Sequence, residues 1–324
     1  MVKAVRIHAP GGPEALILDE VEVAAPGPGE ALVRHTAIGL NFIDTYHRSG
    51  LYRLADLPRA LGVEGAGTVE AVGAGVTAVA PGDRVAYGGV LGSYCEARVM
   101  PAERLLKLPD AIPDEQAAGM MLQGMTARYL LRATYRVKKG DTILIHAAAG
   151  GVGLIACQWA RHLGATVIGT VSTQEKAALA RAHGCDHPIL YTKENFVARV
   201  REITGGKGLP VVYDSVGKDT WEGSLDCLAP RGLMVTFGNA SGPVPPFSVL
   251  TLSQKGSLFL TRPTLADYVA SRAELEETAG ELFDVVMKGA VKIEVRQRYP
   301  LAEAARAHAD LEARRTAGST ILIP

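Results

Sequence analysis

The sequence has few of the features that mark membrane, secreted or nucleic-acid-binding proteins. None of its apolar runs approaches the roughly 20 residues that a helix needs to span a bilayer. The first residues, MVKAVRIHAPGGPEAL, contain neither the apolar core nor the small-residue cleavage site of a signal peptide. The formal net charge is +0 at pH 7, so nothing favours nucleic acid or an anionic membrane as a partner. We therefore expect a cytoplasmic protein.

Cysteine is also scarce, and its spacing excludes the common zinc motifs. The four cysteines are far apart and form no Cys-x-x-Cys pair: Cys95, Cys157, Cys185 and Cys227. A structural zinc site needs closely spaced thiolates, and none of the eight histidines forms a metal-type pair. We predict free, mostly buried thiols and no metal site.

What is present is the composition of a folded globular chain. The 324 residues are enough for two domains with a substantial core. Hydrophobic residues make up 48% and charged residues 21%, and the mean hydropathy is +0.12. These values are ordinary for a soluble protein and argue against disorder.

The residue pattern changes along the chain. Residues 1–110 hold short β-type runs separated by Gly and Pro, which indicates a β-rich, partly open barrel. Residues 114–134 have helical spacing. From Asp141, strand and helix patterns alternate, which implies βαβ units and a parallel sheet covered on both faces. The final runs should rejoin the first domain. The predicted fold class is α/β, with a Rossmann-type doubly wound parallel sheet inserted in a β-rich domain.

The stretch ILIHAAAGGVG (143–153) reads as a strand, a tight turn and the start of a helix. Unpaired N–H groups and the positive dipole end make a helix N-terminus a phosphate site. Gly150 lets the backbone approach a pyrophosphate, and Gly153 allows close packing of helix on strand. Ala148 replaces the first glycine of G-x-G-x-x-G, which is tolerable if φ stays negative there. The alternative is a purely structural turn, but the flanking strand and helix favour a dinucleotide site.

The end of the next strand bears on which dinucleotide is bound. An NAD site usually has Asp or Glu about 20 residues further on, bonded to the ribose. At that position this sequence has Val171, Ser172 and Thr173, and Lys176 follows one helical turn later. A hydroxyl and an ammonium group favour a 2′-phosphate and therefore NADP(H). The alternative is that Ser172 is a helix N-cap and Lys176 a solvated charge.

Several segments resemble the medium-chain dehydrogenase/reductase superfamily, and within it the zinc-free quinone oxidoreductases related to zeta-crystallin. The resemblance runs from end to end and is strongest at 38–52, 61–73, 140–153, 211–221, 233–244 and the ending GSTILIP. It implies a GroES-like catalytic domain over residues 1–124 and 262–324. It also implies an NADP-binding Rossmann domain over residues 125–261.

The chain departs from the zinc-dependent branch of that superfamily at the metal-binding motifs. The Cys-x-x-Asp region corresponds to 40–44 (LNFID), without cysteine, and Gly-His-Glu corresponds to 62–64 (GVE). The cysteine-rich lobe is absent. Zinc would lose its thiolate and imidazole ligands together. A quinone spreads the charge of an arriving hydride over a conjugated system, so it needs no Lewis acid.

The resemblance also implies roles for individual residues. Asn41 and Thr126 lie near the nicotinamide and its ribose, and Gly150, Gly151 and Val152 hold the pyrophosphate. Further cofactor contacts are expected from Ser172, Lys176 and Tyr191 at the 2′-phosphate, and from Ser215, Phe237, Asn239, Leu260 and Arg314. Tyr46 and Tyr52 line the substrate cleft, the alternative being amphipathic packing with a wet hydroxyl. Asp44 fixes its loop rather than acting as a base.

Together these features predict a zinc-independent NADPH:quinone oxidoreductase, with NADPH in the interdomain cleft and a small-molecule quinone as substrate. Two β-type edges, at 244–254 and 256–264, and the resemblance predict a homodimer through sheet-edge pairing. The nearest alternative is an NADPH-dependent reductase of α,β-unsaturated carbonyls. From another class, a non-catalytic NADPH- or RNA-binding crystallin-like protein stays open. A zinc-dependent alcohol dehydrogenase is a more distant alternative.

Overall fold

The computed structural model describes all 324 residues and divides them into two compact units. The first unit consists of Met1–Met125, Val269–Met287 and Ile293–Pro324, and the second of Thr126–Tyr268 with Lys288–Lys292. These units differ from the predicted domain ranges at residues 125, 262–268 and 288–292. The predicted domain ranges stay a prediction.

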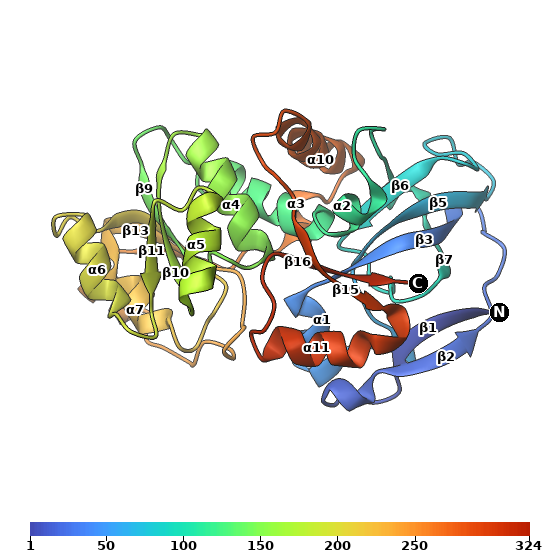
Figure 1. Ribbon diagram of the computed structural model, residues 1–324, viewed down its shortest axis with the longest axis horizontal. Helices are drawn as coiled ribbons and strands as arrows, with labels where there is room; N and C mark the ends of the chain where they lie inside the picture. Colours follow the sequence, from blue (N-terminus) through green and yellow to red (C-terminus); the bar gives the residue numbers. More distant parts are fainter. The chain divides into compact units, whose positions relative to one another are not determined.

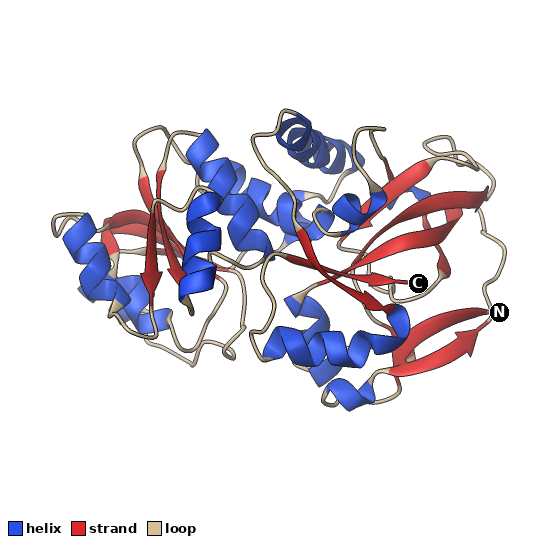
Figure 2. Cartoon of the chain, in the orientation of Figure 1, coloured by secondary structure: helices blue, strands red, loops and turns tan.

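The second unit is built on a six-stranded parallel sheet (Figures 1 and 2). In chain order its strands are β9 (Thr142–Ile145), β10 (Thr166–Val171), β11 (His187–Leu190), β12 (Leu209–Asp214), β13 (Leu228–Thr236) and β14 (Phe259–Thr261). In space the order is β11-β10-β9-β12-β13-β14, so the direction of winding reverses between β9 and β12. This is the doubly wound order of nucleotide-binding sheets. The predicted fold class is confirmed.

Helices cover both faces of this sheet (Figure 1). One face carries α4 (Gly151–His162) and α5 (Gln174–Ala182), and the other carries α6 (Phe196–Ile203) and α7 (Trp221–Asp226). Because both faces are covered, the central strands are apolar throughout rather than alternating. Leu144, Ile168 and Val212 on three neighbouring strands belong to one buried cluster.

The end of the second unit differs from the sequence prediction. Of the two predicted β-type edges, residues 256–264 do contain β14, but 244–254 do not form a strand. They contain α8 (Leu250–Gln254) instead, after two prolines that cannot donate to a ladder. The short helix α9 (Leu265–Tyr268) follows β14, and the Tyr268 ring stacks on Tyr129 with centroids 4.6 Å apart. Because Tyr129 also belongs to the second unit, this stacking is one contact that joins Tyr268 to that unit.

The first unit contains two mainly antiparallel sheets. The larger, of seven strands, comprises β15 (Val295–Pro300), β16 (Ser319–Ile323), β3 (Glu30–Leu40), β5 (Glu64–Val72), β6 (Arg84–Gly88) and β8 (Leu106–Lys107), with β7 (Ala97–Pro101) also on β3. The smaller comprises β1 (Val2–Ile7), β2 (Ile17–Val21) and β4 (Arg59–Ala60). In the larger sheet Thr320 pairs with Leu40, so the chain end lies beside the residue that precedes Asn41.

The helices of the first unit are α1 (Phe42–Ser49), α2 (Asp114–Ala118), α10 (Arg272–Met287) and α11 (Ala304–Glu312), and the boundary between the units falls within α3 (Met121–Tyr129). Short 3-10 turns lie at Pro13–Ala15, Ala102–Arg104 and Leu301–Glu303. The predicted helix over 114–134 is interrupted at Gly119, and residues 130–134 form a π-helical turn. A Cβ on Gly119 would lie 3.0 Å from the Ser319 Cβ, so close tertiary packing accompanies the break.

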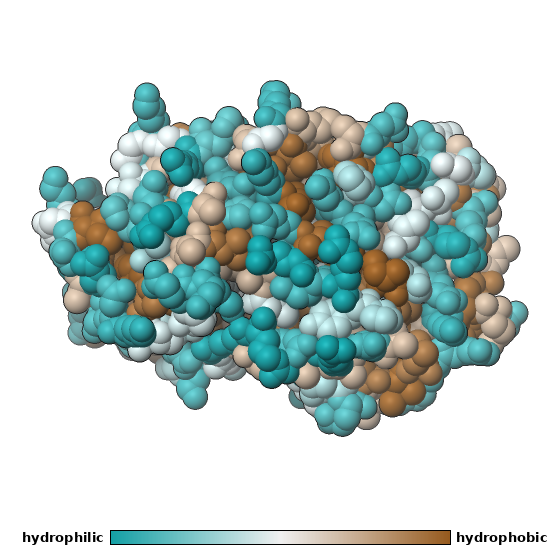
Figure 3. Space-filling model, in the orientation of Figure 1, coloured by the Kyte–Doolittle hydropathy of each residue, from teal (hydrophilic) through white to brown (hydrophobic).

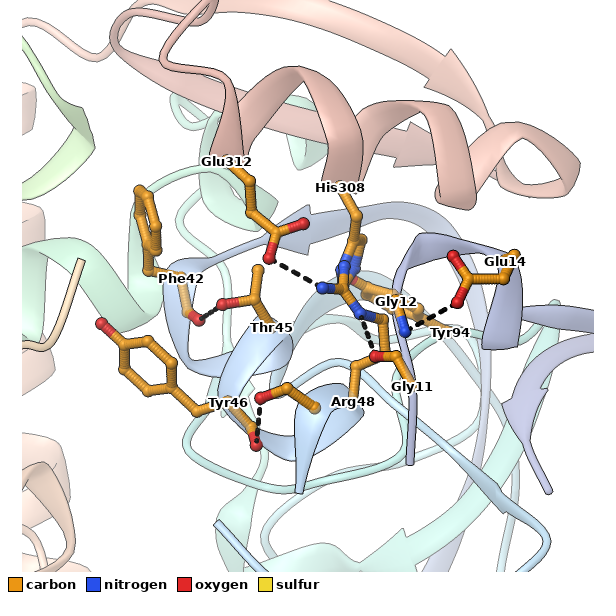
Figure 4. Close-up of polar contacts among 11 residues, drawn as sticks. Gly11, Gly12, Glu14, Phe42, Thr45, Tyr46, Arg48, Tyr94, His308 and Glu312 are labelled. Atoms are coloured by element: carbon orange, nitrogen blue, oxygen red, sulfur yellow. Dashed lines mark hydrogen bonds and ion pairs between the residues drawn. The ribbon is translucent and has the colours of Figure 1, made fainter. Parts of the chain in front are cut away.

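Arg48 ties α1 to α11 (Figure 4). Its guanidinium is buried, with Nη1 3.0 Å from His308 Nδ1, while Nη2 donates to Glu312 Oε1 at 2.7 Å. Nε donates to the Gly11 carbonyl at 3.2 Å. The C-terminal helix is therefore fixed to the helix that follows Asn41.

On the face that Figure 3 shows, apolar side chains lie in small groups among hydrophilic ones. None of the helices combines the length and the apolar character that a bilayer span requires.

Candidate active site

Asn41 lies at the junction between β3 and α1, where it is the helix N-cap. Its backbone N–H donates to Asp44 Oδ2 at 2.9 Å, so Asp44 caps the helix and fixes this junction. The Asn41 side chain is held at both ends: Nδ2 donates to Glu64 Oε2 at 2.6 Å, and Oδ1 accepts from Gln123 Nε2 at 3.1 Å. An amide held in this way is pre-organised for a ligand.

Two buried carboxyl groups, those of Glu64 and Asp44, accept hydrogen bonds from Asn41. Burial raises the pKa of Glu64 to about 8, although the hydrogen bonds from Asn41 and the Leu122 backbone oppose the shift. Burial likewise raises the pKa of Asp44 to about 7, opposed by hydrogen bonds from Asn41 and Tyr94. Both groups change charge close to neutral pH, which is common at functional sites.

Glu64 and Gln123 were not among the predicted site residues. Besides the correspondence of 62–64 to Gly-His-Glu, a signal in the sequence is Gly39, in β3. A Cβ there would lie 2.2 Å from the Ala118 carbonyl oxygen and 2.3 Å from Glu64 Oε2. Glycine at this position leaves room for the carboxyl group, but the sequence does not say what fills the space.

The two predicted substrate-side tyrosines lie together in the first unit. Tyr46 is on α1, which ends at Gly50 in the left-handed conformation with φ 79°. The chain then turns back, and the Tyr52 N–H donates to the Tyr46 carbonyl at 3.0 Å. The rings meet edge to face with centroids 5.2 Å apart. Tyr46 is 8% exposed and Tyr52 half-buried, so a substrate role for them stays a prediction.

The glycine turn of the second unit joins β9 to α4 as predicted. Gly150 is the helix N-cap with φ −79°, and no side chain caps the first turn. The N–H groups of Gly151 and Val152 therefore remain without intrahelical partners, as a pyrophosphate site requires. Positive φ falls at Ala147 (52°) rather than at Ala148, so the expected negative φ at Ala148 is confirmed.

Gly153 is a second glycine that the turn requires. A Cβ there would lie 2.3 Å from the Ala147 carbonyl oxygen and 2.8 Å from the Ala148 Cα. No side chain fits without moving the turn, which confirms the predicted close packing of helix on strand.

The predicted 2′-phosphate residues gather at the carboxyl ends of β10 and β11. Ser172 follows β10 and Tyr191 follows β11, where the Tyr191 N–H donates to the Val171 carbonyl at 3.2 Å. The N-cap of α5 is Thr173, whose Oγ1 accepts from the Lys176 N–H at 3.2 Å. The alternative that Ser172 is the N-cap is therefore wrong, and the Ser172 hydroxyl does not cap α5.

One acidic residue of α5, Glu175, was left out of the sequence argument. Its pKa is lowered by a hydrogen bond from its own backbone N–H and by one from the Thr173 hydroxyl. The carboxylate is therefore held on the first turn of its own helix, where the dipole favours it.

Three more predicted contacts lie at the carboxyl ends of β12 and β13. Ser215 follows β12, and Phe237 and Asn239 follow β13. The Phe237 N–H donates to the Asp214 carbonyl at 2.8 Å, and a Cβ on Gly238 would lie 2.3 Å from the Ser215 carbonyl oxygen. These neighbouring strand ends pack closely at the carboxyl-end side of the sheet, where open α/β sheets bind ligands.

The remaining predicted contacts are more scattered. Thr126 is buried on α3, and its hydroxyl hydrogen-bonds with Tyr129. Leu260 lies mid-strand in β14, opposite Met234, and packs on the core cluster of the second unit. Arg314 follows α11 in the first unit, with φ 60°. Their cofactor roles stay predictions.

The donor set does not fit a zinc ion. Val63 has no donor atom, both Glu64 oxygens accept from N–H groups, and both ring nitrogens of His35 are hydrogen-bonded, to the Cys95 carbonyl and Tyr87. Nowhere do three or more His, Cys, Asp or Glu side chains converge as a metal site requires.

Comparison with known proteins agrees with this geometry. Residues 27–110 match the family described as alcohol dehydrogenase GroES-like domain, and residues 151–287 match the family described as zinc-binding dehydrogenase. A quinone oxidoreductase of Pseudomonas aeruginosa is 59% identical over the full length of both chains. A 2-haloacrylate reductase of a Burkholderia species is 51% identical over 100% of this chain and 99% of its own.

The solved structure of Escherichia coli quinone oxidoreductase in complex with NADPH is 52% identical, with a TM-score of 0.98 over 99% of this chain and all of that one. The chain belongs to the quinone oxidoreductase family of the medium-chain dehydrogenase/reductase superfamily.

Proposed function

We propose that this protein reduces a quinone with NADPH and without zinc. The observation that carries the proposal is the cofactor half of the site: an uncapped helix N-terminus at Gly150, and Ser172, Lys176 and Tyr191 at the ends of the next two strands. Relatives at 59% and 52% identity are quinone oxidoreductases, and the E. coli structure contains NADPH.

The residues of the second unit hold the cofactor. The N–H groups of Gly151 and Val152 bind the pyrophosphate at the positive end of the α4 dipole. Lys176 and the Ser172 hydroxyl bind the 2′-phosphate, and Tyr191 contacts the same end. Further contacts come from Ser215, Phe237, Asn239 and Leu260, and from Arg314 of the first unit. When bound, NADPH supplies the hydride.

The residues of the first unit orient the reacting groups. Asn41 offers an amide that Glu64 and Gln123 hold in place, and it contacts the nicotinamide and its ribose, as does Thr126 of the second unit. Tyr46 and Tyr52 form an aromatic surface for a planar quinone, with ring centroids 5.2 Å apart. Orientation and a few hydrogen bonds are the whole contribution of the protein to the step.

A reductase of α,β-unsaturated carbonyls is the second candidate, because one relative at 51% identity is a 2-haloacrylate reductase. An acrylate is an α,β-unsaturated acid, and a hydride can add to it as to a quinone. A naphthoquinone and a small enone, each supplied with NADPH in the presence of a chelator, separate the two. Faster turnover of the quinone supports the first proposal, and turnover of the enone alone contradicts it.

We also propose that two copies associate through the edge of the parallel sheet. β14 is the edge strand, and three apolar side chains on or near it are exposed: Phe259 (61%), Val249 (78%) and Leu250 (59%). Burial of such an edge prevents uncontrolled pairing. A dilution series in mass photometry that finds only monomer contradicts this. The cytoplasmic location stays a proposal, supported by four free, buried thiols.

A further inference from the structure

A buried chain of hydrogen bonds runs from Glu64 to β16. Glu64 Oε2 accepts from Asn41 Nδ2 at 2.6 Å, and Asn41 Oδ1 accepts from Gln123 Nε2 at 3.1 Å. Gln123 Oε1 in turn lies 2.9 Å from the Ser319 hydroxyl. All four side chains are buried, so the direction of each hydrogen bond depends on that of its neighbours.

The Glu64 end of this chain suits an ionised carboxylate. One oxygen accepts from the Asn41 side chain, and the other accepts from the Leu122 backbone N–H at 2.8 Å. Because both Glu64 oxygens accept hydrogen bonds, the Asn41 amide has to present its nitrogen to Glu64. Its oxygen then faces Gln123.

The Ser319 end favours the opposite direction. The Ser319 hydroxyl has one hydrogen but lies 2.6 Å from the Gly119 carbonyl oxygen as well as 2.9 Å from Gln123 Oε1. If the hydrogen goes to the closer carbonyl, Ser319 has to accept from Gln123, and the amides of Gln123 and Asn41 are both reversed. Because an amide exchanges its oxygen and nitrogen by a half-turn, reversal leaves the heavy atoms in place.

A proton on Glu64 completes the reversed chain, because the carboxylic acid donates to the Asn41 oxygen. We propose that Glu64 is a positioning residue that sets the direction of the Asn41 amide: the carboxylate holds the Asn41 nitrogen, and the carboxylic acid holds the oxygen. The inference rests on the proposed function, in which Asn41 contacts the nicotinamide and its ribose. Reversal exchanges the donor and the acceptor that Asn41 offers there, and we take the direction found in the structure, with Asn41 Nδ2 toward Glu64, as the competent one.

The surroundings of Glu64 bring the loss of its proton into a pH range in which the enzyme can be assayed. Its pKa is raised to about 8 by burial, and Asp44 on α1 adds the repulsion of a second carboxyl group. Tyr94, which donates a hydrogen bond to Asp44, is the other titratable group that acts on Glu64. Asp44 has a raised pKa of about 7, so a pH profile has to separate two carboxyl groups.

Glu64→Gln makes the reversed state permanent. The Leu122 N–H requires the oxygen of the substituted amide, so the nitrogen of that amide faces Asn41 and reverses the Asn41 side chain. The chain of hydrogen bonds stays complete as far as Gly119, so we expect the variant to fold. We expect kcat with NADPH and a naphthoquinone to fall at least about 10-fold while the Kd of NADPH changes less than about 3-fold, because the phosphates bind elsewhere.

The pH dependence separates positioning from a merely structural role. In the wild type we expect kcat to rise as Glu64 ionises, whereas Glu64→Gln stays low and flat, and Asp44→Asn keeps the rise. Unfolding temperatures give a readout without activity. Because the pKa of Glu64 is raised from 4.5 to about 8 in the folded state, wild-type stability falls as pH rises from about 4.5 to about 8, so the advantage of Glu64→Gln should grow over that range and level off above it.

Glu70→Gln is the matched control, since Glu70 lies on the same strand but is exposed beside Arg34; it should change none of these quantities. Wild-type kcat in Glu64→Gln at every pH overturns the inference. So does a variant that fails to fold, or a wild-type kcat without the predicted rise. If the wild type turns over no acceptor with NADPH, the proposed function fails instead, and the unfolding temperatures still test the Glu64 titration.

Discussion

At the scale of single residues, we expect the choice of cofactor to depend on the end of β10. Lys176 and Ser172 stand there, and the nearby Glu175 is held on its own helix by its backbone N–H and Thr173. A 2′-phosphate should therefore meet an ammonium and a hydroxyl group rather than a carboxylate.

Lys176→Ala should raise the KM for NADPH by about 10-fold or more and leave the KM for NADH within about 2-fold, because only NADPH carries the phosphate. Lys207→Ala is the control, because Lys207 is exposed and lies before the amino end of β12, whereas the cofactor site is at the carboxyl ends of the strands. It should change neither KM value. Steady-state kinetics with both cofactors measure this. An equal loss with NADH would place Lys176 outside the 2′-phosphate site.

The sequence indicated these residues but not their local structure. It offered Ser172 as a possible N-cap, whereas Thr173 caps α5, because both residues can cap and only the backbone decides which does. It gave no role to Glu64, Gln123 or Ser319. They meet Asn41 only after strands β3, β5 and β16 and helix α3 have packed, and no local spacing in the sequence encodes that meeting.

At the scale of elements, the junction of β9 and α4 depends on close contact at Gly153. Gly153→Ala should destabilise the protein by about 1–3 kcal/mol, since its Cβ would meet the Ala147 carbonyl oxygen at 2.3 Å. It should also weaken NADPH binding, because the turn that presents the N–H groups has to move. Denaturant unfolding and NADPH titration measure the two effects.

Gly280→Ala in α10 is the matched control. Nothing lies within 4 Å of its added Cβ, so the variant should gain up to about 1 kcal/mol from helix propensity. If both alanine variants were stabilised alike, the close packing at Gly153 would not be what the turn requires.

The tie between α1 and α11 gives a second test at this scale. Arg48→Met leaves His308 Nδ1 and the Gly11 carbonyl without their donor, while the half-exposed Glu312 can turn to water. The expected cost is about 2 kcal/mol in the free energy of unfolding. Arg306→Met, an exposed arginine on α11, should cost less than about 1 kcal/mol. Equal costs would mean that Arg48 does not fix the C-terminal helix.

Elements with a strong repeating pattern were predictable, and those shaped by tertiary packing were not. The strands and helices from β9 to β13 follow from apolar runs and helical spacing, and the doubly wound order follows from their alternation. The helix predicted over 114–134 is broken where Gly119 packs on Ser319. The edge predicted at 244–254 contains α8, because apolar composition alone does not separate a short helix from a strand.

At the scale of the whole molecule, the proposed function assigns the phosphate-bearing cofactor to one unit and an oriented amide and two tyrosines to the other. The family was recognisable from the sequence because its motifs run from end to end. The domain ranges and the homodimer remain predictions, because they depend on surfaces rather than on local pattern.

The most direct test of the central claim is the ratio of kcat/KM for NADPH to that for NADH, measured with a naphthoquinone in the presence of a chelator. We expect a ratio of about 10 or more, with full activity in the chelator, because a 2′-phosphate site selects NADPH and no metal takes part. Equal use of the two cofactors, or loss of activity that stoichiometric zinc restores, would contradict it.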